Sequence, residues 1–382
     1  MLKSEIALVC SPYLAPYASQ EVAALGYRVS ASDNLTIFLH GTIEDAMKLN
    51  LHLRTANRVL FLIRRFRAGD ADELYFQASK INWDDIFDAQ GYIHIHSVVN
   101  NKTIRDNRFA NLRLKDAIAD FFMRKYNKRP DSGQDKSRSA VFLHWNNDVC
   151  SVYLDTSGET IAKHGYRDNP WKAPMIESLA AATLYASEWD RRSNFVNPMC
   201  GSGTLAIEAA MMAANIAPGL LRNNFGFMHC RYYDPARWRA LKEEAKSRIT
   251  KISGIEIYAT DIDGQAVEAA KANAEKAGVA KYINFLRCDF KFTPIPDGGG
   301  TVFLNPEYGE RLGDIARLET TYKEIGDFFK QKCAGYTGFV FSGNPNLVKK
   351  IGLRAERRLP FLNGKIECRL LKYELYEGSK SV

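Results

Sequence analysis

The 382-residue sequence predicts an α/β protein in which a doubly wound, mostly parallel sheet follows a smaller α+β region. Two observations indicate this fold class. Beyond about residue 173, helical and strand periodicities alternate regularly, which is typical of a doubly wound sheet. Before it, short strands and helices form a small basic region, and a stretch with Gly, Asp and Pro separates the two. We therefore expect an N-terminal part at 1–60, a second domain at 61–158, a linker at 159–172 and a third domain at 173–382.

The first half alternates short strands and helices. Apolar runs and helical spacings predict strands at 6–9, 35–39, 59–63 and 92–99, and helices at 15–25, 43–53, 70–82 and 112–126. Two further strands, at 140–145 and 149–154, flank Asn146-Asn147-Asp148, which is a hairpin signal.

The second half has the longer rhythm of a parallel sheet. We expect helices at 174–188, 204–214, 236–250 and 264–277, strands at 194–197, 255–260, 282–287 and 301–304, and closing strands within 365–376. An insert at 215–240 contains the aromatic residues Phe225, Phe227, Tyr232, Tyr233 and Trp238. Stacking on nucleic-acid bases and packing in a local core are both open for these rings.

The charge is positive and unevenly placed. The net charge is +8, and between Lys102 and Arg138 eleven basic residues face five acids. A polyanion is the simplest partner for such a patch, because phosphate contacts release counterions. No apolar run is long enough for a membrane span. The seven cysteines are single, with no cysteine–histidine cluster, so we expect no metal site and a reducing, cytoplasmic location.

A glycine-rich loop leaves a short apolar strand and opens a helix. Asn197, Pro198, Met199, Cys200, Gly201, Ser202 and Gly203 form this loop. Glycines allow the backbone to pass close to a ligand, and a helix N-terminus supplies N–H groups. The run from Gly201 to Ala206 also fits a dinucleotide pattern, which would require an acid about 20 residues later.

Acidic residues follow the next two strands instead. The strand at 255–260 ends at Asp261, far beyond the dinucleotide spacing, and the third strand ends at Asp289. These carboxylates can accept hydrogen bonds from ribose hydroxyls and from an adenine amine, and Phe290 can cover the adenine face. A helix cap is the alternative role, which suits Asp263 better than Asp261.

The strand at 301–304 is followed by Asn305-Pro306-Glu307-Tyr308. An exocyclic base amine is a weak nucleophile because its lone pair is delocalised into the ring. The Asn305 side-chain oxygen and the Pro306 carbonyl can accept its two N–H groups and direct the lone pair at a methyl donor. Tyr308 can stack on a base that is turned out of its helix. An ordinary Asn-Pro turn is the alternative interpretation.

Several motifs together resemble the THUMP-domain guanine-N2 methyltransferases, and most narrowly the ribosomal RNA large-subunit methyltransferase L group. The resemblance rests on the runs 50–58, 154–158, 164–167, 197–208, 215–219 and 305–313. It implies a ferredoxin-like piece, an RNA-binding THUMP domain and one Rossmann-like methyltransferase domain of class I.

The resemblance also implies roles for single residues. The cofactor is S-adenosylmethionine, with residues 197–203 around its methionine part, Asp261 on the ribose and Asp289 at the adenine. Asn305, Pro306 and Tyr308 hold the target base, and Ala173-Pro174 lies near the cofactor entry. The implied partner is RNA, in the first place 23S ribosomal RNA.

One departure from the family pattern concerns the target base. Glu307 stands where the family usually has a second proline, and its carboxylate can contact the guanine N1–H. Arg311 can bind a phosphate or form a salt bridge. Other functions stay open from the residues alone: the same chemistry on transfer RNA or on adenine N6, a non-catalytic RNA-binding protein, or a nicotinamide oxidoreductase.

Overall fold

The computed structural model describes residues 3–168, 175–309 and 315–376. Ala173, Pro174 and Arg311, for which we predicted roles, lie outside these ranges. The chain forms two compact units, each built from several segments. Unit 1 comprises Met1–Cys10, Ala18–Ile161 and Arg222–Glu244, and unit 2 comprises Ser11–Tyr17, Ala162–Leu221 and Ala245–Val382. Within the described residues, none of the helices has both the length and the apolar character needed to cross a bilayer.

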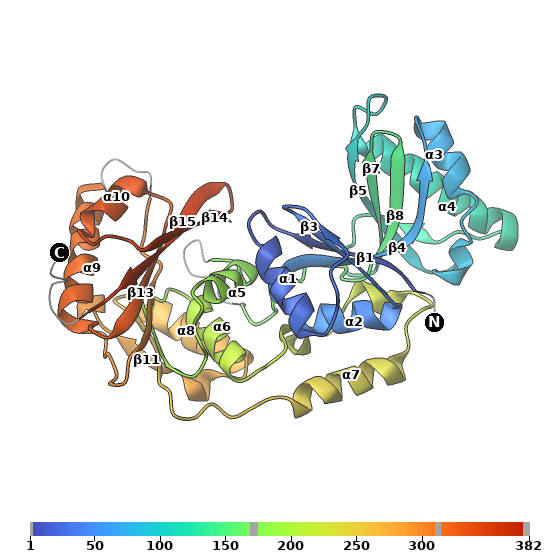
Figure 1. Cartoon of the computed structure of the whole chain (residues 1–382). Coiled ribbons are helices and arrows are strands. Elements are labelled where there is room, and N and C mark those ends of the chain that lie inside the picture. Colours follow the sequence, from blue (N-terminus) through green and yellow to red (C-terminus); the bar gives the residue numbers. More distant parts are fainter. Residues whose placement is uncertain (1–2, 169–174, 310–314, 377–382) are drawn as a thin grey trace. The chain divides into compact units, whose positions relative to one another are not determined.

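Unit 1 contains an eight-stranded mixed sheet (Figure 1). Its strand order is β2-β3-β1-β4-β8-β7-β5-β6. The strands are β1 (Ser4–Cys10), β2 (Ala31–Ser32), β3 (Thr36–Gly41), β4 (Ala56–Arg67), β5 (Tyr92–Asn100), β6 (Asp131–Ser132), β7 (Ser139–Asn146) and β8 (Val149–Asp155). The expected strands and the hairpin at Asn146-Asn147-Asp148 are confirmed, whereas the two-residue strands β2 and β6 carry no sequence signal.

Strand β4 is longer than predicted because it serves two neighbours. Its first half pairs with β1, with Phe61 opposite Ile6, and its C-terminal part pairs with β8, from Leu60 opposite Asp155 to Arg67 opposite Val149. The sequence pattern marked only the apolar centre, 59–63. The N-terminal part and the domain that follows therefore share one continuous sheet.

The helices of the first half follow the predicted order. They are α1 (Ala15–Ala24), α2 (Ile43–His52), α3 (Ala71–Ala78) and α4 (Asn107–Tyr126). Helix α4 begins five residues earlier than predicted, because Asp106 caps it by accepting a hydrogen bond from the Arg108 amide. Helices α3 and α4 pack against each other, as Figure 1 shows.

The aromatic insert folds with unit 1 from Arg222 onward, although its sequence lies inside the C-terminal half. It contains a 3₁₀ turn at Gly226–His229 and runs into α7 (Pro235–Ser247). Phe225, Phe227 and Trp238 are buried, with the two phenylalanine rings stacked and Trp238 edge-on to both, so for these three rings packing is the correct alternative. The Phe227 amide donates to the Thr156 carbonyl, which ties the insert to the end of β8.

Unit 2 is the predicted doubly wound sheet. Its order is β11-β10-β9-β12-β13-β15-β14, with parallel pairing from β11 to β13 and with β15 antiparallel to both β13 and β14. The strands are β9 (Asn194–Pro198), β10 (Ile257–Asp261), β11 (Asn284–Arg287), β12 (Gly300–Leu304), β13 (Tyr336–Ser342), β14 (Arg357–Asn363) and β15 (Ile366–Glu374). The helices are α5 (Glu177–Ala186), α6 (Thr204–Ala213), α8 (Gly264–Lys276), α9 (Ile315–Lys332) and α10 (Pro345–Lys350).

Strand order locates the functional edge of unit 2. From β9 the chain continues outward to β10 and β11, and then returns to β12, on the other side of β9. This reversal is a topological switch point, where ligands of open α/β sheets bind beyond the carboxyl ends of the strands. The loops after β9 and β12 both begin there. They are the two loops in which the sequence motifs lie.

The core of unit 2 fills the space between the sheet and α9. Tyr322, Phe328 and Phe329 on α9 are buried against Val340 of β13 and Tyr373 of β15. The expected linker also contributes buried residues to the described structure. His164 and Tyr166, at its centre, are enclosed and both hydrogen-bond to Glu208 on α6.

Candidate active site

The loop after β9 is held from both neighbouring strands. Asn197 is fully buried, and its Nδ2 donates to the Phe303 carbonyl of β12 at 2.8 Å. The Cys200 amide donates to the Thr260 carbonyl of β10 at 2.9 Å. The Asn197 Oδ1 and the Ser202 Oγ are buried, without a hydrogen-bond partner in the described part of the chain. This loop thus combines a fixed backbone with unused polar atoms.

The two glycines of the loop meet different surroundings. Both have positive φ, +54° at Gly201 and +82° at Gly203. A Cβ at Gly201 would meet nothing within 4 Å, so a ligand can approach the backbone there. A Cβ at Gly203 would lie 2.8 Å from the Ala270 Cβ, so this glycine allows α6 to pack against α8. Gly203 precedes α6 without a side-chain cap, which leaves first-turn N–H groups for a ligand.

Met199 also has a positive φ, +56°, which is uncommon for a residue with a side chain. The preceding Pro198 is buried as the last residue of β9. The Met199 side chain packs against the core, so the backbone of this residue turns toward the sheet edge under constraint. Such local strain persists only where the surrounding structure enforces it.

Asp261 ends β10, as predicted, and contacts the glycine loop directly. Its Oδ2 accepts from the Gly201 amide at 3.0 Å, and its Oδ1 accepts from the Asp263 amide at 3.0 Å. Each carboxylate oxygen keeps a further lone pair for a ligand hydroxyl. The helix cap belongs to Asp263, whose side chain accepts from the Gln265 amide of α8. This separation of roles agrees with the sequence interpretation.

The region of Asp289 differs from the prediction in one respect. Strand β11 ends at Arg287, two residues before Asp289, because the chain enters a 3₁₀ turn at Phe290–Phe292. Asp289 caps this turn through the Lys291 amide, and its carboxylate lies 3.4 Å from the Lys291 Nζ. Phe290 packs edge-on against Phe328 in the core and is 7% exposed, whereas Phe292 is 77% exposed.

Asn305 and Pro306 follow directly after β12. The Asn305 Oδ1 is buried and has no hydrogen-bond partner among the described residues. A buried acceptor without a partner is costly in a folded protein, and functional sites are one reason for its presence. Pro306 is buried, and its ring restricts the direction in which the chain leaves the strand. The acceptor that was predicted for a base amine, the Asn305 Oδ1, is therefore present, and no described residue donates a hydrogen bond to it.

Tyr308 is partly buried beside the end of β13. Its ring packs against Phe341 with ring centroids 6.5 Å apart, and its hydroxyl accepts a hydrogen bond from the Asn363 Nδ2 at 2.7 Å. Gly343 makes room for it, since a Cβ there would lie 3.1 Å from the Tyr308 ring. These contacts hold the ring in one orientation, which a stacking platform requires.

Neither the Tyr308 hydroxyl nor the Cys200 thiol is suited to act as a base or nucleophile. Burial raises the pKa of Tyr308 well above its usual range. Burial, with a smaller contribution from the Asp261 charge, likewise raises the pKa of the Cys200 thiol. Both groups stay protonated near neutral pH. A protonated thiol is a weak nucleophile, so Cys200 has no part in nucleophilic catalysis.

Glu307 points its carboxylate at an arginine. The Arg317 Nη2 lies 2.7 Å from the Glu307 Oε2, and both side chains are more than 60% exposed. Solvent screens an ion pair this exposed, so it contributes little to stability. The carboxylate stands on the strand-end loop, two residues after Asn305, with Arg317 beside it.

Arg167 supports the glycine loop and was not selected by sequence reasoning. Its Nη2 donates to the Thr204 Oγ1 at 3.0 Å and to the Met175 carbonyl at 2.6 Å, and lies 3.4 Å from the Glu177 Oε2. Thr204 is the first residue of α6. The signal available in the sequence was the run His164-Gly-Tyr-Arg167, which carried part of the family resemblance without a role for the arginine.

Family models match nearly the whole chain. Residues 164–372 match the model described as RMKL-like, methyltransferase domain. Residues 5–60 match the RlmL ferredoxin-like domain, and residues 68–155 match the THUMP domain. The methyltransferase match contains the loops after β9, β10 and β12.

Named relatives extend the same comparison. The "Ribosomal RNA large subunit methyltransferase K/L" of Syntrophotalea carbinolica is 35% identical over 95% of the chain, and the chain spans about half, 52%, of that protein. The "Putative RNA methyltransferase slr0064" of Synechocystis is 33% identical, with 94% of each chain covered. The solved structure "SMU.472, a putative methyltransferase complexed with SAH" is 26% identical, with a TM-score of 0.87 and full coverage of both chains.

Proposed function

The chain belongs to the RMKL-like methyltransferase family, and from this membership we propose that it methylates the exocyclic N2 amine of a guanine in 23S ribosomal RNA. S-adenosylmethionine is the cofactor of its methyltransferase domain. The observation that carries the proposal is the buried, unpartnered Oδ1 of Asn305 at the end of β12. This atom is an acceptor beside the switch point of the sheet, where a substrate amine requires one.

The residues of the loop after β9 fit this cofactor. The open space at Gly201 admits a ligand next to the backbone, and Asp261 is fixed against that backbone. We assign residues 197–203 to the methionine part, Asp261 to the ribose hydroxyls and Asp289 to the adenine amine. Phe290 keeps a place in this set only through the 7% of its surface that is exposed, because its ring packs in the core against Phe328.

In the proposed reaction, residues of the chain hold and polarise the exocyclic amine of the target base. The bound cofactor supplies a methyl group on a positively charged sulfur. The Asn305 Oδ1 accepts one N–H of the base amine and the Pro306 carbonyl accepts the other. Two acceptors in these positions draw the nitrogen out of conjugation and aim its lone pair. They also stabilise the positive charge that the nitrogen gains during transfer.

The aromatic ring of Tyr308 supplies the remaining contact. Held by Phe341 and Asn363, it offers its free face to a base that has left its stack. RNA as the substrate is supported by the THUMP match and by the excess of six basic residues between Lys102 and Arg138.

Methyl transfer from labelled S-adenosylmethionine tests the proposal. We expect the full chain to label ribosomal RNA from cells that lack the gene, and mass spectrometry to locate the label as N2-methylguanine in 23S RNA. Asn305→Ala should lower the transfer rate by roughly 100-fold, the scale for loss of one preorganised polar contact, with unchanged cofactor affinity.

The possible outcomes separate the alternatives. If the label appears on transfer RNA or on adenine, the proposed substrate is wrong. That result does not contradict the proposed role of Asn305 and Pro306 in holding the amine. If the wild-type chain binds the cofactor and RNA but transfers no methyl group to any RNA, the catalytic proposal is wrong. If Asn305→Ala transfers at the wild-type rate, the clamp is wrong.

A further inference from the structure

The N-termini of α5 and α6 meet at the Arg167 side chain. Its Nη2 donates to the Oγ1 of Thr204, the first residue of α6, and to the Met175 carbonyl just before α5. The same nitrogen lies 3.4 Å from the Oε2 of Glu177, the first residue of α5. One guanidinium, 11% exposed, therefore connects the beginnings of two helices at the point where the glycine loop enters α6.

The charges at this junction leave a positive excess. Neither helix begins with a side-chain cap, since Ile176 precedes α5 and Gly203 precedes α6. The N-terminus of a helix carries roughly half a positive charge, and the Arg167 guanidinium adds a full one. Among the described residues, Glu177 supplies the one carboxylate within ion-pairing distance of Arg167. The sum is roughly one positive charge, which a further carboxylate would neutralise.

Three hydrogen-bond donors at this junction or within two residues of it are unused. The Arg167 Nε, the Ser178 Oγ of α5 and the Ser202 Oγ before α6 are buried, without a hydrogen-bond partner in the part of the chain that the structure describes. Ser178 is 0% exposed and Ser202 is 3% exposed. A buried donor without a partner costs free energy, and a bound ligand is one explanation for it. Donors at the beginnings of helices form the kind of set that binds an anion.

The methionine part of S-adenosylmethionine brings such an anion, its carboxylate, to the adjacent loop. Residues 197–203, which we assign to this part, contain no basic side chain and lead directly into Thr204. The charged group bonded to this loop is the Asp261 carboxylate, which is negative itself. The loop alone therefore offers no counter-ion to the cofactor carboxylate. A guanidinium pairs with a carboxylate in a charge-assisted, planar arrangement, and exclusion of water strengthens the bond.

We propose that Arg167 binds the carboxylate of S-adenosylmethionine, together with the first-turn N–H groups of α6 and the Ser202 hydroxyl. The inference rests on the proposed assignment of residues 197–203 to the methionine part of the cofactor. It gives Arg167 a direct contact with the cofactor in addition to its contacts with Thr204 and Met175. The chain then selects adenosyl ligands that carry a carboxylate over those that lack it.

Two ligands that differ only in the carboxylate test the inference: S-adenosylhomocysteine and decarboxylated S-adenosylhomocysteine. Calorimetric titration of the full chain should show tighter binding of the first ligand. Arg167→Met should weaken that binding roughly 10- to 100-fold, the scale for a hydrogen bond to a charged group, and leave the affinity for the decarboxylated ligand unchanged. The matched control, Arg354→Met, removes an exposed arginine of unit 2 and should change neither affinity.

A second variant, Ser202→Ala, removes one hydroxyl and no charge. It should weaken binding of S-adenosylhomocysteine by roughly two- to tenfold, again without an effect on the decarboxylated ligand. Thermal unfolding checks that each variant is folded, and if Arg167→Met is not, Ser202→Ala decides by the same comparison.

The comparison of the two ligands separates a direct contact from support of the loop. If Arg167→Met weakens both ligands by the same factor, Arg167 acts only through the glycine loop and the inference is wrong. The same conclusion follows if the wild-type chain binds both ligands equally well. Because these titrations contain no RNA, a chain that shows the expected selectivity but methylates no RNA contradicts only the proposed function.

Discussion

At the scale of single residues, the proposed clamp uses neutral groups. An amide oxygen and a carbonyl oxygen accept N–H groups over a wide pH range, and the raised pKa of Tyr308 keeps the adjacent phenol neutral as well. Glu307 is the exception, since it brings a carboxylate next to these neutral groups. Arg317 lies 2.7 Å from this carboxylate, and solvent screens the exposed pair.

Replacement of Glu307 tests whether the carboxylate selects the base. If it accepts the guanine N1–H, Glu307→Pro should lower transfer to guanine by roughly ten- to a hundredfold relative to adenine, because a hydrogen bond to a charged group contributes about 1.5–3 kcal/mol. Methylation assays with RNAs that differ only in the target base measure this ratio. Glu307→Gln keeps the size and removes the charge. Unchanged activity and base preference in both variants would remove the carboxylate from the mechanism.

At the scale of elements, two glycines of one loop have separable tasks. Gly201 opens the backbone to a ligand, and Gly203 lets α6 approach α8. The N-terminus of α6 and the end of β10 meet at this loop through the bond between Gly201 and Asp261. The loop is therefore where cofactor affinity and helix packing can be changed independently.

Two single variants, Gly201→Ala and Gly203→Ala, test whether cofactor binding and helix packing depend on different glycines. Both substitutions put a side chain at positive φ, so this strain is common to them. Gly203→Ala should cost about 1–3 kcal/mol more in the free energy of unfolding, because its Cβ collides with Ala270. Gly201→Ala should instead weaken cofactor binding. Urea unfolding and calorimetric titration with S-adenosylhomocysteine measure the two effects, and equal loss of stability in both variants would contradict the assignment.

At the scale of the whole molecule, chain order and spatial order differ. In the sequence, the segment Arg222–Glu244 lies between stretches that belong to unit 2. In the structure, this segment packs in unit 1. Its Gly226 is in close contact with unit 1, since a Cβ there would lie 2.4 Å from the Asp155 carbonyl oxygen. The RNA-binding candidate unit therefore depends on residues from the other half of the chain for part of its core.

Phe227→Ala tests this dependence. Phe227 is fully buried between Phe225 and Trp238, so truncation should destabilise unit 1 by about 3–5 kcal/mol. Hydrogen exchange should show the loss in β7 and β8, while S-adenosylhomocysteine binding by unit 2 stays at the wild-type affinity. The exposed Tyr126 offers a control truncation outside this cluster. Faster exchange confined to residues 222–244 would mean that the stability of the rest of unit 1 does not depend on the insert.

Much of the fold was accessible from the sequence. Periodicity and loop composition depend on near neighbours along the chain, so strands, helices and the loops between them could be located with small errors at their ends. Helix α9, strand β13, helix α10 and strand β14 had no prediction, although α9 has a clear amphipathic pattern. The two-residue strands β2 and β6 are too short to have a pattern at all.

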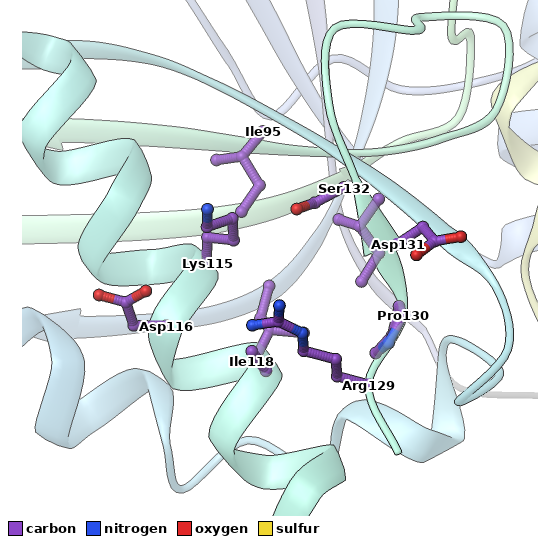
Figure 2. A pocket seen from close by; sticks show the side chains of 10 residues that line it. Ile95, Lys115, Asp116, Ile118, Arg129, Pro130, Asp131 and Ser132 are labelled. Atoms are coloured by element: carbon purple, nitrogen blue, oxygen red, sulfur yellow. The ribbon is translucent and has the colours of Figure 1, made fainter.

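The sequence by itself determined the chemistry of the site: a glycine loop after one strand, an acid after the next, and an amide with a proline after a fourth. Only the tertiary structure decided which of these groups contact each other. In the folded chain, Asp261 contacts Gly201 and Phe290 packs in the core. Lys115 and Arg129 point toward a hollow between α4 and β6 (Figure 2). The physical reason is that residue type and spacing are local, whereas a contact between distant residues depends on the path of the whole chain between them.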